Sequence, residues 1–242
     1  MAWSTIAILF FFTLLASSVQ RVTGFGFGII VMTMFPYLLP SFGEATALSG
    51  LLAIVTALVP AMRHLKIVPW RKLLPILLTF LVVSFFSVKL AAHVSSRDLK
   101  HILGGVLILA SIYFFFFSER VHIRPTLPLQ VGLGSLSGVM GGLFAMQGPP
   151  AVVYFMSTAS DKDEYIALTQ WYFLAGNTMM SLFRLREGFV TPVVLESWLI
   201  AVPATLAGLW IGSKVFDKMN AKVLRSLVYS FLGISGLVAL LA

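Results

Sequence analysis

Long apolar segments constrain this chain more than any other feature. Ten of them follow one another along the 242 residues: 3–20, 28–39, 45–62, 73–90, 99–117, 127–143, 149–156, 165–183, 193–215 and 223–241. About 20 apolar residues are enough for a helix to cross the hydrocarbon core of a bilayer. The sequence therefore predicts an all-α polytopic membrane protein, a single membrane domain over 1–242 in which the first segment is a helix of the mature chain.

The composition supports this class and excludes others. Hydrophobic residues make up 59% of the chain, charged residues 11%, and the mean hydropathy is +0.96, far from the averages of soluble domains. The net charge of +8 does not indicate a nucleic-acid partner, because the basic residues lie in short loops and form no stripe. The chain has no cysteine, so disulfides and thiolate metal sites are excluded. No cofactor or metal is expected, and the predicted location is the cell membrane (inner or plasma membrane).

The ten segments form two sets of five. Gly43–Ser49 aligns with Asp163–Thr169, and 89–100 aligns with 214–225, at an offset of about 120 to 125 residues. We therefore expect two homologous repeats, 1–120 and 125–242. The first two segments of each set are short or interrupted by glycine or proline, so each pair is interpreted as a broken-helix hairpin that dips into the membrane. The other three are predicted to be transmembrane helices.

Loop charges favour inverted repeats. With inverted halves, eleven lysines and arginines lie inside and five lie outside, the outer set being Lys89, Arg97, Lys100, Arg184 and Arg186. Parallel halves would give eight on each side, without the inside excess that membrane proteins show. This count treats Arg184 as a loop residue and leaves Arg21 as the one basic residue outside the loops.

Two breaks in the apolar segments indicate a binding site. Gly24, Gly26 and Gly28 interrupt the first half, and Gln147-Gly148-Pro149-Pro150 interrupts the second at the same register. A helix broken at membrane depth exposes backbone groups that must face protein or a water-filled cavity. The N-terminal ends of half-helices attract anions. We therefore expect a small anion to bind between the two breaks. Such glycines can also serve close helix packing, the role expected of Gly104, Gly105, Gly208 and Gly212.

Polar side chains near the breaks complete the candidate site. Arg21 is a candidate because a cation at membrane depth is costly unless it faces a cavity; the alternative is that it reaches the interface. Each uncharged candidate could instead join helices by hydrogen bonds, and Gln170 and Ser49 are weaker still. The predicted substrate-binding residues are Gln20, Arg21, Thr23, Gly24, Gly26, Gly28, Gln147, Gly148, Pro149 and Asn177. Glu44, Glu164 and Glu196 are interpreted as helix caps, with proton coupling as the alternative for Glu196.

Enzyme motifs are absent from the sequence. There is no His-Glu-x-x-His pair and no Walker loop, and Gly134-Ser-Leu-Ser-Gly138 has leucine where a nucleophile elbow needs serine. No catalytic residues are therefore expected.

The motifs, taken in order, resemble those of the TauE/SafE (sulfite exporter, TSUP) family. The first half has Gly24-Phe-Gly26-Phe-Gly28, Glu44-Ala-Thr-Ala-Leu-Ser, Arg63-His64-Leu and Ile67-Val68-Pro69-Trp70; the second has Gly138–Gly142, Gly148-Pro149-Pro150 and Ala167-Leu168-Thr169. Two positions depart from the family pattern: Phe27 interrupts a glycine run that the family often ends as three glycines, and Gln147 precedes the second motif. The resemblance implies a secondary transporter of sulfite, organosulfonates or related small anions.

The expected function is that of a carrier or exporter of such anions, with the substrate held between two half-helix N-termini. A passive anion channel is the alternative, and a membrane-embedded enzyme is less favoured. The identity of the anion, the direction of transport, coupling to a proton or cation, and homo-oligomer formation stay open at this point.

Overall fold

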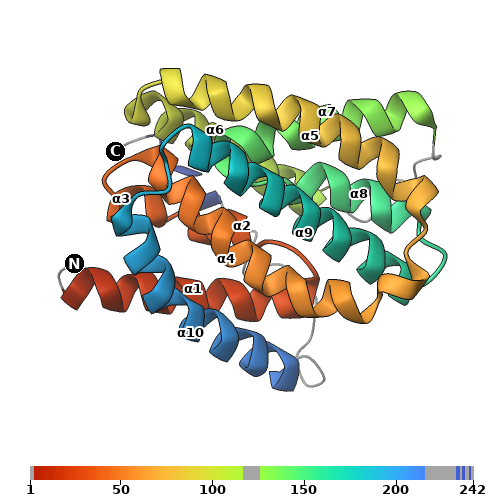
Figure 1. Cartoon of the computed structure of the whole chain (residues 1–242), viewed down its shortest axis with the longest axis horizontal. Coiled ribbons are helices and arrows are strands. Elements are labelled where there is room, and N and C mark those ends of the chain that lie inside the picture. The colour runs from red at the N-terminus through yellow and green to blue at the C-terminus, as the bar shows by residue number, and fades with distance from the viewer. Residues whose placement is uncertain (1–2, 117–125, 216–232, 235, 238–239, 241–242) are drawn as a thin grey trace.

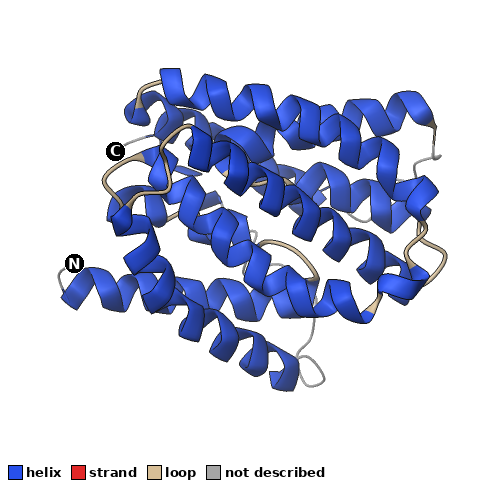
Figure 2. Cartoon of the chain, viewed as in Figure 1, coloured by secondary structure: helices blue, strands red, loops and turns tan. Residues whose placement is uncertain are grey.

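The computed structural model describes residues 3–116, 126–215, 233–234, 236–237 and 240. Within these residues every regular element is a helix (Figure 2). The predicted segment 223–241 and the basic residues at positions 120, 124, 218, 222 and 225 lie mostly or entirely outside the described residues.

The described helices follow the predicted segments closely. The first half holds α1 (Trp3–Thr23), α2 (Phe27–Val31), α3 (Phe35–Leu38), α4 (Phe42–Arg63), the 3₁₀ helix η1 (Leu65–Ile67), α5 (Trp70–His93) and α6 (Ser96–Phe116). The second half holds α7 (Leu127–Phe144), α8 (Gly148–Thr158), α9 (Lys162–Arg186) and α10 (Pro192–Val215). Five of these, α1, α4, α5, α7 and α10, are long and apolar enough to cross a membrane. The chain is an all-α polytopic membrane protein, as predicted.

Two details of the predicted hairpins differ in the structure. α1 is a continuous helix of 21 residues and α7 one of 18, so each is a candidate span by itself rather than a short piece. The segment 28–39, expected to be one half-helix, is divided into α2 and α3 by a turn at 32–34. Pro36 lies in the first turn of α3, where its missing N–H costs no helical hydrogen bond.

Three helix pairs form the body of the protein (Figure 1): α1 with α10, α5 with α7, and α4 with α9 between them. Glycines permit two of these contacts. A Cβ on Gly208 would lie 2.4 Å from the carbonyl oxygen of Leu14, and one on Gly212 would lie 2.7 Å from that of Ser18. The packing role predicted for Gly208 and Gly212 is confirmed. Gly142 of α7 meets Ser87 of α5 in the same way. A Cβ on Gly104 would likewise lie 2.9 Å from the carbonyl oxygen of Gly236, whereas no described atom lies within 4 Å of one on Gly105.

The two halves run in opposite directions. The ends of α1, α4 and α10 and the start of α9 surround one cavity, and the start of α5 binds the start of α9, so these five termini share one end of the molecule. α7 runs parallel to α5, because its successive glycines contact successive turns of α5. Each of α7, α9 and α10 is therefore antiparallel to its counterpart α1, α4 or α5. Inverted repeats require this arrangement, although the duplication itself stays a prediction.

Helix caps fix the starts of the two central helices. The Ser41 hydroxyl, at the N-cap of α4, accepts a hydrogen bond from the backbone N–H of Glu44 and donates one to its carboxylate. Asp161 accepts from the N–H of Glu164 at the start of α9 (2.8 Å). Glu44 and Glu164 lie in the first turns of α4 and α9, as predicted, whereas Glu196 lies beyond the first turn of α10, so the capping role predicted for it is wrong. Glu44 also accepts a hydrogen bond from Thr191, which connects the start of α4 to the start of α10.

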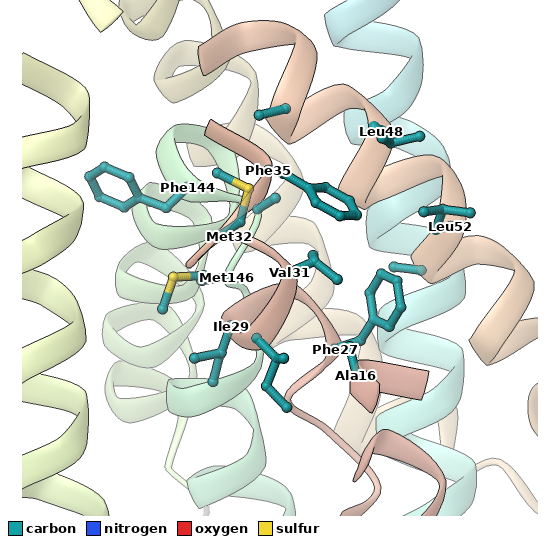
Figure 3. Close-up of a cluster of buried hydrophobic side chains, with 14 of the residues drawn as sticks. Ala16, Phe27, Ile29, Val31, Met32, Phe35, Leu48, Leu52, Phe144 and Met146 are labelled. Atoms are coloured by element: carbon teal, nitrogen blue, oxygen red, sulfur yellow. The ribbon is translucent and has the colours of Figure 1, made fainter. Parts of the chain in front are cut away.

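The short helix α2 lies in the hydrophobic interior. Ile29, Val31 and Met32 are buried, and Figure 3 shows them between side chains of α4, such as Leu48 and Leu52, and Met146 from the second break. The helix α2, which follows the first break, therefore packs against apolar side chains on both sides. This packing positions the backbone around 24–28 against the backbone around 145–147.

Candidate functional site

The first break lies between α1 and α2. Gly24 and Gly26 have positive φ angles of 82° and 101°, a region that side chains disfavour, so the chain turns sharply here. Nothing lies within 4 Å of the position of a Cβ on Gly26, so this residue borders open space. The break predicted from the glycine pattern is confirmed at residues 24–26, whereas Gly28 belongs to the first turn of α2.

Side chains from three helices hold this break. The Gln20 Oε1 accepts a hydrogen bond from the backbone N–H of Phe27 (3.1 Å), and its Nε2 donates to Thr56 of α4 (2.6 Å). Thr23 donates to the carbonyl oxygens of Val19 and Phe25. From α9, Gln170 donates to the carbonyl oxygen of Gly24 (3.0 Å). Both groups of the Gln20 amide are therefore occupied by protein, so this residue positions the break.

The second break lies between α7 and α8. Ala145 has a φ of 56°, which is unusual for a residue with a side chain, and Gln147 is the N-cap of α8. Proline occupies the first turn of α8, as predicted. A chain of hydrogen bonds holds the turn: Tyr172 of α9 donates to Ser137 of α7 (2.7 Å), and Ser137 donates to the carbonyl oxygen of Gln147.

The two breaks touch each other. A Cβ on Gly28 would lie 2.2 Å from the carbonyl oxygen of Ala145, so only glycine permits this approach. Gly148 lies across from the first break, since a Cβ on it would be 3.8 Å from the Cβ of Phe25. Segments about 120 residues apart in sequence therefore meet inside the helix bundle.

A small cavity lies between the breaks. It measures about 30 Å³, counted as space open to the centre of a water molecule, which is room for two or three waters. Its lining residues are Gln20, Gly26, Phe27, Gly28, Ile29, Ala53, Ala145, Met146, Gln147, Gly148, Phe173 and Asn177. Six of the ten predicted site residues line it. A cavity of this size suits a small solute.

A larger cavity of about 540 Å³ lies beside the first break. We call it the vestibule; its lining residues are Gln20, Arg21, Val22, Thr23, Gly24, Thr56, Pro60, Lys162, Tyr165, Ile166, Gln170, Leu209 and Ser213. Gln20 borders both the vestibule and the small cavity. Two basic residues, Arg21 and Lys162, contribute to its wall, which favours anions in this space.

The structure separates the remaining predicted residues from the small cavity. Arg21, Thr23 and Gly24 line the vestibule. Arg21 is exposed in the last turn of α1 and faces this cavity, which agrees with both alternatives predicted for it, a cation facing a cavity and a cation reaching the interface. Pro149 is buried and lines neither cavity, and as a proline it has no N–H to donate to a ligand.

Gln147 is the most distinctive polar residue of the small cavity. Its side chain is 3% exposed, and neither its Oε1 nor its Nε2 has a hydrogen-bond partner. A buried amide without a partner costs free energy, which native structures seldom tolerate without a reason. Asn177 also lines the cavity, with its Nδ2 bonded to the carbonyl oxygen of Phe173 (2.8 Å). The Gln147 amide is therefore free to bind a solute.

Arg184 was not predicted to be a site residue. It was counted as a loop residue outside the membrane, but it is 0% exposed in the last turn of α9. Its location in sequence, beside the exposed Arg186, gave no signal of burial. Ser137, Tyr172 and Thr56, which support the two breaks, were likewise not singled out.

The arrangement is suited to binding a solute rather than to transforming one. It offers an unpartnered amide, backbone groups at the start of α8, aromatic walls and a basic vestibule. The N-terminus of α8 contributes a partial positive charge, but Pro149 and Pro150 remove two of its free N–H groups. α2 has only five residues, so its dipole is weaker than the sequence analysis assumed. The Gln147 amide becomes the principal candidate donor.

Comparison with known proteins is consistent with the interpretation that the protein binds a solute rather than transforming it. The chain is 26% identical to a probable membrane transporter protein of Methanocaldococcus jannaschii over 246 aligned residues, covering 90% of this chain and 89% of the relative. It is 25% identical to a probable sulfite/organosulfonate exporter TauE of Cupriavidus necator over 217 residues, covering 88% and 85%. A probable membrane transporter protein of Bacillus subtilis is 26% identical over 179 residues, covering 66% and 68%.

No solved structure matches the chain. The family model described as sulfite exporter TauE/SafE matches residues 9–239, almost the whole chain. The protein therefore belongs to the TauE/SafE family and is a membrane transporter rather than an enzyme.

Proposed function

We propose that this protein is a secondary carrier of small anions, such as sulfite or organosulfonates, across the cell (inner or plasma) membrane. The substrate binds in the small cavity between the two breaks. The observation that carries this proposal is the meeting of the breaks at Gly28 and Ala145 around the unpartnered amide of Gln147.

The relative from Cupriavidus necator is named as a probable sulfite/organosulfonate exporter. This name supports the choice of substrate class. The vestibule supports it independently, because Arg21 and Lys162 raise the local concentration of anions beside Gln20. An anion would leave the vestibule past Gln20 and reach Gln147. The amide dipole binds it without the strong attraction of a full charge, so release stays fast.

The end of the molecule that holds the vestibule is proposed to face the cytoplasm. Of the twelve described lysines and arginines, seven lie at this end and five, including the buried Arg184, lie at the opposite end. Cytoplasmic loops of membrane proteins carry the excess of basic residues, so this count supports a vestibule on the cytoplasmic side. In this conformation an exporter would load its substrate.

The proposal is tested with purified protein in liposomes. A carrier shows uptake of labelled sulfite that saturates with concentration and counterflow against internal unlabelled sulfite. A passive channel would give a large flux that does not saturate, and that result would reject the carrier. Thermal stabilisation tests binding directly, because a ligand at 100 times its dissociation constant adds about 2.7 kcal/mol. An unchanged melting temperature with sulfite, sulfonates and small carboxylates alike would contradict the anion site.

A further inference from the structure

Arg184 is a buried cation whose hydrogen bonds are incomplete. Its Nη2 donates to the carbonyl oxygens of Gly141 (2.8 Å) and Gly142 (3.3 Å) in the last turn of α7. Its Nε and Nη1 have no partner, and among the described residues no carboxylate pairs with it. An uncompensated cation away from water is costly, and in membrane proteins such residues mark substrate and ion pathways.

One serine hydroxyl without a partner lies near this guanidinium, and a second lies beside Gly28, which lines the small cavity. Gly50 of α4 is the point of contact: a Cβ there would be 3.1 Å from the Nη1 of Arg184 and 3.2 Å from the Oγ of Ser181. Next to Gly50, Ser49 has its Oγ 3.7 Å from the position of a Cβ on Gly28. Both serines are buried, and neither Oγ has a hydrogen-bond partner. Hydroxyl and guanidinium groups together form a set of donors for an anion.

These groups lie beyond the small cavity, toward the end of the molecule opposite the vestibule. On α9, Asn177, Ser181 and Arg184 are four and three residues apart and share one face. Asn177 lines the cavity, and a long side chain on a helix points back toward the helix N-terminus, which here is the direction of Asn177. On α4, Ala53 lines the cavity and Ser49 lies one turn before it.

We propose that Arg184, with the hydroxyls of Ser49 and Ser181, forms a second anion subsite that receives the substrate from the small cavity. This inference rests on the proposed function. The ligand is a small oxyanion, a sulfite or sulfonate group, because a planar guanidinium matches paired oxygens. The subsite is closed in this conformation, since α4 and α9 meet at Gly50, and it opens when these helices separate on the side opposite the vestibule.

The test measures sulfite transport in proteoliposomes for Arg184→Gln, Arg184→Lys and the control Arg186→Gln, whose arginine is exposed two residues further on. The loss of a charge-assisted hydrogen bond lowers the maximal rate of Arg184→Gln about tenfold or more. Arg184→Lys restores part of the rate, and Arg186→Gln transports like the unchanged protein. A full rate in Arg184→Gln would overturn the inference.

A purely structural role for Arg184, as a cap on the carbonyls of α7, predicts a different outcome. Arg184→Gln would then lower the melting temperature but leave the rate per folded molecule and the half-saturating sulfite concentration unchanged, which would also overturn the inference. Ser181→Ala and Gly50→Ala provide smaller changes in case Arg184→Gln does not fold. The first removes a donor, and the second places a methyl group between Nη1 and the Ser181 hydroxyl.

Both smaller variants are expected to slow transport while the protein stays folded in size-exclusion chromatography. Normal transport by both would contradict the subsite. Sulfite binding and transport by the unchanged protein distinguish a failure of this inference from a failure of the proposed function. Saturable sulfite transport that is insensitive to all four changes at positions 50, 181 and 184 rejects only the subsite, whereas the absence of any sulfite binding or transport rejects the proposed function and the subsite with it.

Discussion

Single residues decide whether the two breaks can meet. Gly28 is the clearest case, because the space that a Cβ would need is occupied by the backbone of Ala145, which cannot rotate away as a side chain could. Gln147 is the second case, since it keeps a buried amide without a partner where an apolar residue would be more stable. Gly28 therefore determines the geometry of the site, and Gln147 contributes its chemistry.

Gly28→Ala is expected to separate the breaks or to strain them. Overpacking of a close contact costs about 1 to 3 kcal/mol, and sulfite binding should be lost with it. The matched control is Gly132→Ala in α7, where nothing lies within 4 Å of the new Cβ. That change should be neutral or slightly stabilising, because alanine favours the helix by about 0.5 to 1 kcal/mol. Melting temperature and sulfite-induced stabilisation are measured for both; equal behaviour would refute the backbone contact.

Gln147→Leu is expected to abolish sulfite binding without destabilising the protein. An unpartnered buried amide costs about 1 to 3 kcal/mol, and leucine removes this cost. Gln130→Leu is the contrasting variant: Gln130 donates to the hydroxyl of Tyr154, so its loss leaves a buried hydroxyl unpaired and lowers stability. A lower melting temperature for Gln147→Leu than for Gln130→Leu would show that the Gln147 amide has a structural partner.

Connections between elements hold the helix ends around the vestibule. Lys72, at the start of α5, binds the Glu164 carboxylate at 2.5 Å and the carbonyl oxygen of Thr158 at 3.0 Å. It therefore joins the start of α5 to the end of α8 and the start of α9. The carbonyl at the C-terminus of α8 favours a cation, so the contact with the helix dipole adds to the ion pair.

Lys72→Met is expected to destabilise the protein by about 1 kcal/mol, because the pair is partly exposed and the aliphatic stem is retained. The loss should shrink in high salt, which screens the ion pair in the unchanged protein. Lys66→Met is the control, since Lys66 lies exposed in η1 of the same connection. Thermal unfolding at low and high salt measures both. Identical curves for the two variants would assign no stabilising role to the Lys72 contacts.

At the scale of the whole molecule, the antiparallel halves give the protein two chemically different ends. The vestibule opens at the end with the greater number of basic residues, and Arg184 lies toward the other end. The opposite directions of α4 and α9 support the predicted inverted repeats, and α4 and α9 also form the central contact that the proposed subsite would open.

The absence of cysteine makes this orientation directly testable. Lys66→Cys, at the vestibule end, should react with a membrane-impermeant maleimide only from the cytoplasmic side, and Arg97→Cys, at the opposite end, only from outside. Both side chains are exposed, so the substitutions should not disturb the fold. Labelling is measured in intact cells and in inverted vesicles. Reaction of Arg97→Cys from the cytoplasmic side would reverse the proposed topology.

The sequence by itself determined the class of the protein, the positions of both breaks and the helix caps. These features are local: apolar length decides whether a helix suits a membrane, glycine and proline decide where it breaks, and Ser41 or Asp161 decides where the next helix begins. Family membership followed from the same motifs. The same local features predicted that Gly26, Gly148 and Gln147 lie at the two breaks.

Only the tertiary structure decided which polar residues face a cavity and which support the fold. Arg184 and Arg21 both lie in the last turn of a long helix, yet one is fully buried and the other exposed. Lipid and protein interior are equally apolar, so the hydrophobic pattern of a membrane helix does not tell its lipid face from its buried face. The difference arises from α4 and α7, which cover Arg184 from positions more than 40 residues away.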